Sequence, residues 1–142
     1  MRHMRVPVLV AALLGLGLAA CVPVVPGLRQ IHGQRWTSRF DVYVQVAGSS
    51  LRLPVDLAID FEQSFQHVTA EATLQYDAGI FRLQTGGLVE LSGQLGFDDS
   101  LTLDSQSGAL SFDGRFVGDR LVGTVAIVGV VPVADVVFYR VR

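Results

Sequence analysis

Hydrophobic and polar residues alternate with a period of two over most of the chain after Trp36. The alternation runs through residues 36–46, 51–61 and 68–76, and Gly48 and the serines after it separate the first two stretches. The side chains of a β-strand point to its two faces in turn, so this period is typical of half-buried strands. The pattern predicts an all-β domain of about eight antiparallel strands joined by short turns, and it allows one short helical turn near residues 62–66.

Three of the later predicted strands carry a glycine in the middle of their apolar face, at Gly93, Gly114 and Gly123. A glycine there loses packing and backbone entropy, so it marks a sharp bend or a close approach of two backbones. Repeated bends curl a sheet into a small closed barrel. We therefore predict a small antiparallel up-and-down β-barrel, with a β-sandwich as the alternative.

The period of two does not say which face of the sheet is the interior. An outer-membrane barrel would turn its apolar face outward, although several apolar runs here are shorter than a bilayer-spanning strand of about 9–11 residues. Residues 121–137 also depart from the alternation, because Val122, Ala126 and Val137 make the second face apolar. We expect both faces to be buried there, covered by the N-terminal segment, by a partner or by lipid.

The chain begins with a short hydrophobic segment. Arg2 and Arg5 precede the uncharged, mostly apolar residues 6–20, which end in Leu18-Ala19-Ala20 and are followed by Cys21. A transmembrane helix needs roughly 20 apolar residues, so this stretch is short for an anchor and is typical of a secretory signal with a small-residue cleavage site. With a cysteine directly after that site, the segment resembles a bacterial lipoprotein signal and its lipobox.

This resemblance implies that residues 1–20 are a cleaved helical signal peptide and that Cys21 carries acyl chains such as palmitate. Several acyl chains anchor a protein stably, because each buried methylene contributes about 0.8 kcal/mol. Residues 21–33 would then be the lipidated cysteine and a flexible tether, and residues 34–142 the barrel domain. In lipoproteins of this kind an Asp after the cysteine retains the protein in the inner membrane, so Val22 implies the outer membrane, facing the periplasm.

Composition excludes some classes of partner. The formal net charge is −2 and no run of basic residues occurs, whereas a nucleic-acid-binding surface needs a basic patch. Cys21 is the only cysteine, so no disulfide forms within the chain. A mature chain of roughly 120 residues is long enough to be held by its hydrophobic core alone.

Residues that could support catalysis are few. His32 and His67 are the histidines after the signal segment, and a metal site needs three or four converging ligands. No Gly-x-Ser-x-Gly nucleophile elbow occurs, and acylation would remove Cys21 as a thiol nucleophile. We therefore expect no enzyme activity, no metal and no cofactor, and the sequence identifies no ligand-binding residues.

Two short motifs resemble the calycin group of barrels, which includes lipocalins and avidins. Gly33-Gln34-Arg35-Trp36 opens the first predicted strand, and Phe138-Tyr139-Arg140 lies in the last. In that group a tryptophan on the first strand packs against a basic residue of the last strand, where the barrel closes. The resemblance implies a structural latch between Trp36 and Arg140. The spacing differs from the lipocalin motif, because Gly33 lies three residues before Trp36 and the lipocalin glycine lies two residues before its tryptophan.

Two functions agree with these observations. The first is a non-catalytic envelope protein with a filled barrel and a structural or interaction role on the membrane surface, where the partner is another envelope protein. The second is a binding protein that holds a small apolar ligand, such as a lipid, inside a calycin-like barrel. Large apolar residues on the predicted inner face favour the first, because about eight strands enclose little free space.

Overall fold

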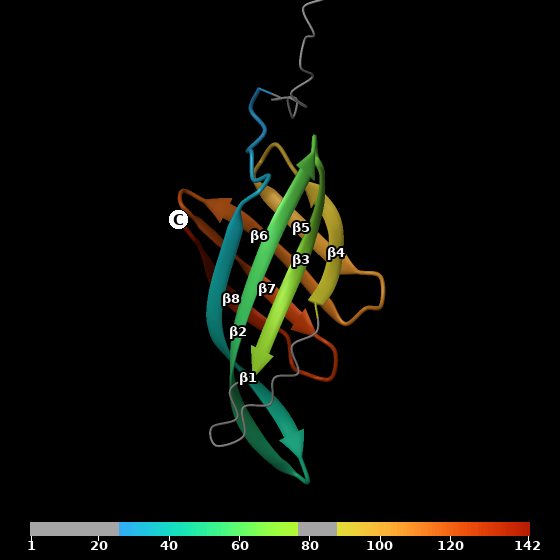
Figure 1. Ribbon diagram of the computed structural model, residues 1–142. Helices are drawn as coiled ribbons and strands as arrows, with labels where there is room; N and C mark the ends of the chain where they lie inside the picture. Colours follow the sequence, from blue (N-terminus) through green and yellow to red (C-terminus); the bar gives the residue numbers. More distant parts are fainter. Residues whose placement is uncertain (1–25, 77–87) are drawn as a thin grey trace, which may run out of the picture.

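The structure is a computed structural model that describes residues 26–76 and 88–142. These residues contain eight β-strands (Figure 1). They are β1 (Arg35–Val46), β2 (Ser49–Ser64), β3 (His67–Tyr76), β4 (Leu88–Leu95), β5 (Ser100–Ser105), β6 (Leu110–Val117), β7 (Arg120–Ile127) and β8 (Val133–Arg140). Each strand pairs antiparallel with the next, and β8 pairs with β1, so the sheet closes into an up-and-down barrel. The predicted barrel is confirmed, and the alternative β-sandwich is not formed.

The apolar face of each strand points into the barrel. The largest fully buried side chains all belong to this inner face or to the segment before β1, and they are Phe61, Phe138, Ile31, Leu57, Ile59, Leu95, Leu101, Leu103, Leu121, Val42, Val55 and Val68. β2 continues to Ser64, and a two-residue turn leads to β3, so the helical turn allowed near residues 62–66 is absent. Within the described residues, no helix is long and apolar enough to cross a membrane.

The inner glycines are points of close backbone approach, as predicted. Gly114 and Gly123 lie opposite each other on β6 and β7. A Cβ atom on either would run into the ring of Phe112 and the backbone of the opposite glycine. The Phe112 ring thus fills the space that two side chains would take, and it packs edge-on against Phe138 with centroids 5.5 Å apart. The glycine pair therefore makes room for an aromatic core inside a narrow barrel.

A β-bulge accounts for the part of the irregular pattern in residues 121–137 that lies in β8, whereas Val122 and Ala126 of β7 are half-buried residues of the outer face. Gly123 pairs with Val136, whereas Val125 pairs with Val133, so β8 holds one extra residue between these pairs. This extra residue lets both valines of β8 pack against the core although they are three positions apart. The outer side chains of these two strands are half-buried or exposed. The described N-terminal residues bond elsewhere, at one end of the barrel, and do not cover this outer face.

The hairpin of β1 and β2 extends beyond the rest of the barrel (Figure 1). Its ladder continues to Val46 and Ser49, whereas β1 pairs with β8 only at Trp36 and Thr37. Ala47 and Gly48 close the hairpin with φ angles of 49° and 80°, the left-handed pair that a two-residue hairpin turn of this twist requires. The result is a two-stranded ribbon at the end of the barrel opposite the N-terminal segment.

Substitution of Gly93 tests the close packing of β4 on β5. A Cβ atom there would overlap the carbonyl oxygen of Thr102. We expect Gly93→Ala to lower the free energy of unfolding by about 1–3 kcal/mol, since the two backbones must move apart. Ser92→Ala, on the exposed face of the same strand, is the control and should change it by less than about 0.5 kcal/mol. Urea denaturation of both variants gives the comparison, and equal stability would contradict the close approach.

Candidate functional site

The segment before β1 closes one end of the barrel. Leu28 and Ile31 are buried and belong to the same core cluster as the inner face of the strands. The amide of Gly33 donates to the carbonyl of Phe61 at 2.8 Å, and the amide of Phe61 donates to the carbonyl of Gln34 at 2.9 Å. The folded domain therefore begins before residue 34, and the predicted tether of residues 21–33 is too long by several residues.

Gln63 holds this segment in place. Its side chain continues the inward series of β2 and is only 6% exposed. The amide oxygen accepts the backbone N–H of Ile31 at 2.8 Å, and the amide nitrogen donates to the carbonyl of Arg29 at 2.9 Å. The same nitrogen donates to the carbonyl of Phe65 at 2.9 Å, which joins the turn between β2 and β3 to the N-terminal segment. One buried amide thus satisfies backbone groups from two loops.

Arg29 ties the other two turns of the capped end together. Its guanidinium contacts the carboxylate of Asp99 with N–O distances of 3.2 and 3.3 Å and donates to the carbonyl of Gly118 at 3.2 Å. The same group lies over the ring of Phe116, 4.9 Å from its centroid. Phe116 in turn meets the indole of Trp36 edge-on, with centroids 5.3 Å apart. The capped end is therefore a connected cluster of one cation and two aromatic rings.

The strand register places Trp36 directly opposite Arg140, where β1 and β8 close the barrel. Among the described residues, however, the contacts of a guanidinium with a ring are Arg29 over Phe116 and Arg120 over Tyr139, and Arg140 is not over the indole. Arg140 lies exposed at the end of β8, whereas Trp36 is buried. The guanidinium that reaches the aromatic rings beside the indole is that of Arg29 from the N-terminal segment, and it lies over Phe116 of β6.

Polar contacts add to the short ladder between β1 and β8. The hydroxyl of Ser38 donates to the carbonyl of Val137 at 2.7 Å, and the amide of Val141 donates to the carbonyl of Arg35 at 2.8 Å. Ser38 is a polar residue on an inner face, and sequence reasoning assigned it no role. Its position within the apolar series of the first strand was the one signal that could have indicated such a bond.

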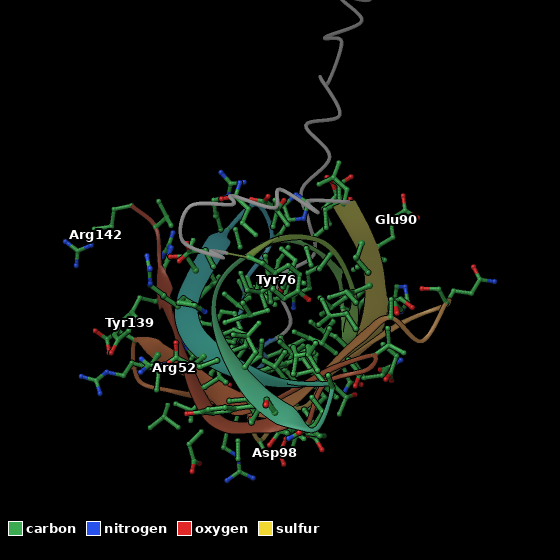
Figure 2. All side chains as sticks on the ribbon, turned by 90° about the horizontal axis from the view of Figure 1, so that it is seen from below. Arg52, Tyr76, Glu90, Asp98, Tyr139 and Arg142 are labelled. Carbon is green, nitrogen blue, oxygen red and sulfur yellow. The ribbon has the colours of Figure 1, made fainter. Side chains whose placement is uncertain are left out.

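The opposite end of the barrel has no such cap among the described residues. A ring of half-buried apolar side chains packs against the core there, and its members are Phe40, Val44, Leu53, Tyr76, Val89, Val130 and Val133. Tyr76 lies within the outline of the barrel when the molecule is viewed from this end (Figure 2). Burial raises the pKa of its phenol, because the charged phenolate is poorly solvated there. We call this end, as far as the described residues define it, the open end.

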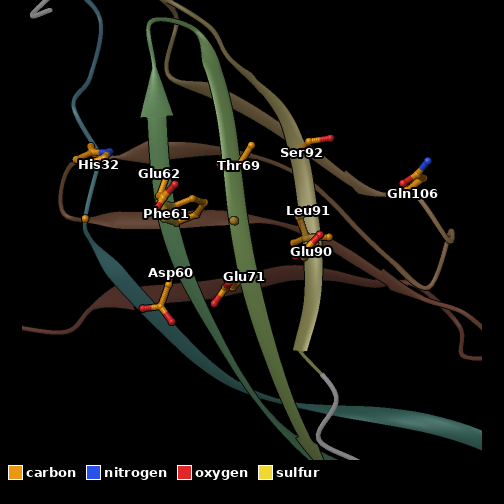
Figure 3. Close-up of a pocket in the computed structure, with 12 residues that line it drawn as sticks. His32, Asp60, Phe61, Glu62, Thr69, Glu71, Glu90, Leu91, Ser92 and Gln106 are labelled. Atoms are coloured by element: carbon orange, nitrogen blue, oxygen red, sulfur yellow. The ribbon is translucent and has the colours of Figure 1, made fainter. Parts of the chain in front are cut away.

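A shallow depression of about 590 Å³ lies on the outer face of β2, β3 and β4 (Figure 3). Asp60, Glu71 and Glu90 line it and are direct neighbours across these three strands. Arg35 pairs with Asp60 at 3.1 Å. Like charges directly opposite each other cost stability, and these carboxylates remain at the surface in contact with solvent. No group of three or more His, Cys, Asp or Glu side chains among residues 26–76 and 88–142 has an arrangement that could hold a metal ion.

The two candidate histidines lie apart. His32 accepts the backbone N–H of Gln63 through Nδ1 at 3.2 Å, which is a structural contact at the capped end. His67 is exposed at the start of β3.

Cys21 and Val22 lie outside the described residues. In comparisons with known proteins, no family model matches the chain and no curated protein matches it at a significant level.

Replacement of Gln63 tests whether its amide holds the capped end. Gln63→Leu leaves the amide of Ile31 and the carbonyl of Arg29 buried without these partners, so we expect the free energy of unfolding to fall by about 2–4 kcal/mol. Gln66→Leu, in the exposed turn nearby, is the control and should change it by less than about 0.5 kcal/mol. Urea denaturation gives both values. A Gln63→Leu protein as stable as the wild type would mean that other contacts hold the segment.

Proposed function

We propose that this chain is a bacterial lipoprotein, anchored in the cell envelope through acyl chains on Cys21. The barrel domain acts without catalysis, in a structural or interaction role on the membrane surface. The non-catalytic structural or interaction role is supported by the filled interior of the barrel. The lipoprotein assignment is supported by the lipobox Leu18-Ala19-Ala20-Cys21 and the apolar segment before it.

A filled interior supports a role for the outer surface. Eight strands enclose a space just wide enough for side chains or for one small ligand. Here Phe61 and Phe138 are fully buried, and Phe112 fills the space over two glycines. Leu28 and Ile31 close one end. Because the protein's own side chains fill this space, we expect a partner molecule to bind the ends or the outer faces of the barrel.

The envelope location rests on the residues around the lipobox. Val22 follows the cysteine, where an Asp would retain a lipoprotein in the inner membrane. The proposed location is therefore the periplasmic face of the outer membrane. Pro26 and Gly27 are exposed, and the chain enters the core at Leu28, so only a short stretch separates the acylated residue from the folded domain.

Removal of the acylated cysteine tests the anchor. We expect Cys21→Ala to abolish labelling of the protein by radioactive palmitate and to release it from the membrane fraction, because acyl chains supply the anchor. Val22→Asp is the matched control, which should keep the label and move the protein from the outer to the inner membrane fraction. Cell fractionation with a high-salt wash gives both results. A Cys21→Ala protein that still sediments with membranes would contradict lipid anchoring.

A second function is favoured by the apolar ring at the open end of the barrel. The ring exposes parts of several large side chains around Tyr76, and a fatty acid or similar lipid would add its chain to them. In this case the domain carries a small apolar ligand at its open end. Trp36 lies at the other end, bonded through its indole N–H to Gln34, so its fluorescence is a poor reporter of such binding.

Equilibrium dialysis of the Cys21→Ala chain against radioactive palmitate tests this second function. If the ligand enters the open end, Val44→Glu should reduce uptake at least about tenfold, because it places a charge in the apolar ring. Val46→Glu changes an exposed valine at the tip of the ribbon and should leave uptake unchanged. Absence of uptake by the unsubstituted chain, for palmitate and for other lipid classes, would leave the structural role alone.

A further inference from the structure

Three turns of the capped end present exposed apolar side chains. Phe65 in the turn between β2 and β3 is 53% exposed, and Phe97 in the turn between β4 and β5 is 57% exposed. Val117, at the end of β6, is 59% exposed. These turns surround the N-terminal segment, because Gln63 bonds the first of them and Arg29 bonds the other two. The three turns therefore lie at the end of the barrel that carries the described N-terminal segment (Figure 1).

Phe65 is an unusual residue for the backbone conformation of its turn. Its φ is 55°, in the left-handed region that glycine and asparagine adopt more readily than a bulky aromatic residue. Strain of this kind costs about 1–3 kcal/mol and is typical of functional positions. The ring is not part of the buried core and is more than half exposed. Folding alone would be served as well by a residue without a large apolar side chain.

The turn that carries Phe97 is fixed by local hydrogen bonds. Ser100 donates to the carboxylate of Asp98 from its hydroxyl at 2.6 Å and from its amide at 3.1 Å. These bonds favour the charged carboxylate and lower the pKa of Asp98. Phe97 is thus presented by an ordered turn and does not fold back onto the core.

We propose that the capped end, defined by Phe65, Phe97 and Val117, lies in the interfacial region of the bilayer. This inference rests on the proposed anchoring through Cys21 and adds the orientation of the domain. Apolar side chains that enter the boundary between headgroups and acyl chains stabilise peripheral binding. Arg120 and Arg140 lie at the same end of the barrel together with the exposed carboxylates of Asp98 and Asp119, so the apolar side chains, and not net charge, carry the proposed contact.

Chain length decides which end faces the membrane. The five peptide steps from Cys21 to Pro26 span at most about 18 Å. β1 has 12 residues, so its far end at Val46 lies roughly 35–40 Å along the strand from the capped end. The tether holds the capped end close to the headgroups but is too short to bring the ribbon tip there while the barrel stands upright. The flank formed by β1 to β4 carries the exposed carboxylates of Glu71 and Glu90 directly opposite each other, whereas the exposed carboxylate of Asp98 at the capped end is paired with Arg115, so the flank is the less suited of the two to lie on the bilayer.

Quenching by brominated lipids tests the orientation. The chain from Cys21 to Arg142 is coupled through its single thiol to a maleimide lipid in vesicles of phosphatidylethanolamine and phosphatidylglycerol. Phe65→Trp and Phe97→Trp report on the capped end, and Leu51→Trp and Val128→Trp, which replace exposed residues at the opposite end, are the controls. The quenching measured for the unsubstituted chain is subtracted, because Trp36 contributes fluorescence to every variant. We expect quenching at least about twofold stronger at the capped end, because interfacial side chains enter by about 5–10 Å.

A binding measurement tests whether these side chains contribute affinity. Coupling of Cys21 to a single fourteen-carbon chain gives only marginal membrane binding, of about 10⁴ M⁻¹. With this anchor, Phe65→Ser with Phe97→Ser should weaken sedimentation with the same vesicles by roughly tenfold, since two apolar rings leave the interface. Leu51→Ser with Val128→Ser should have no effect. Both substituted proteins must first show the thermal unfolding of a folded barrel.

Equal quenching at the two ends, or equal binding by the two double variants, would overturn the proposed orientation. Either result would leave the anchor untouched, because the chemical coupling replaces the cell's own lipidation. Conversely, loss of the palmitate label in cells would refute the lipoprotein assignment whatever the vesicles show. The two proposals therefore fail in separate experiments.

Discussion

Closure of the sheet between β1 and β8 is the constraint on which the rest of this structure depends. Pairing of β8 with β1 at Trp36 and Thr37 joins the two edge strands of the sheet, while the rest of β1 continues with β2 as its ladder partner. The ladder at this seam is short, and the hydroxyl of Ser38 adds a bond to the carbonyl of Val137. Trp36 at this seam also meets Phe116 edge-on, and Arg29 lies over the ring of Phe116. This cluster connects the N-terminal segment to β1 at the point where the sheet closes.

Closure with eight strands also limits what the interior can hold. The inner glycines bring neighbouring backbones close together, and the ring of Phe112 takes the space over Gly114 and Gly123. A larger lumen would need strands with less curvature or more of them. The same packing that stabilises the barrel thus leaves its ends and outer faces for contact with other molecules. This is why the proposed functions concern one end or the other.

The two ends differ because only one of them receives the N-terminal segment. At that end the amide of Gln63 satisfies buried backbone groups, and the surrounding turns point apolar side chains outward. At the opposite end the barrel continues into the ribbon of β1 and β2, and its inner side chains are only half-buried. The proposed anchor at Cys21 precedes the capped end in the chain, so the proposal also gives the domain a direction, with the ribbon of β1 and β2 farthest from the anchor.

Sequence alone determined the class of the fold. Alternation over residues 36–46 and 51–61 indicated strands, and Gly93, Gly114 and Gly123 indicated close approaches, because both signals are local properties of the backbone and of side-chain direction. Cys21 after Leu-Ala-Ala indicated the anchor by motif, and that remains a proposal. The break in the pattern at residues 121–137 was visible, but the bulge in β8 that contributes to it was not, since a bulge is defined by the register between two strands.

Only the tertiary structure decided where the domain begins and which cation meets the aromatic cluster. Residues 28–33 resemble a linker in composition, and their burial depends on Gln63 being brought to them from a distant strand. Trp36 and Arg140 were correctly expected to be neighbours across the seam, yet Arg29 supplies the guanidinium that lies over a ring beside the indole. Contacts of this kind join residues far apart in the chain, and no local sequence pattern says which distant side chains will lie together in the folded protein.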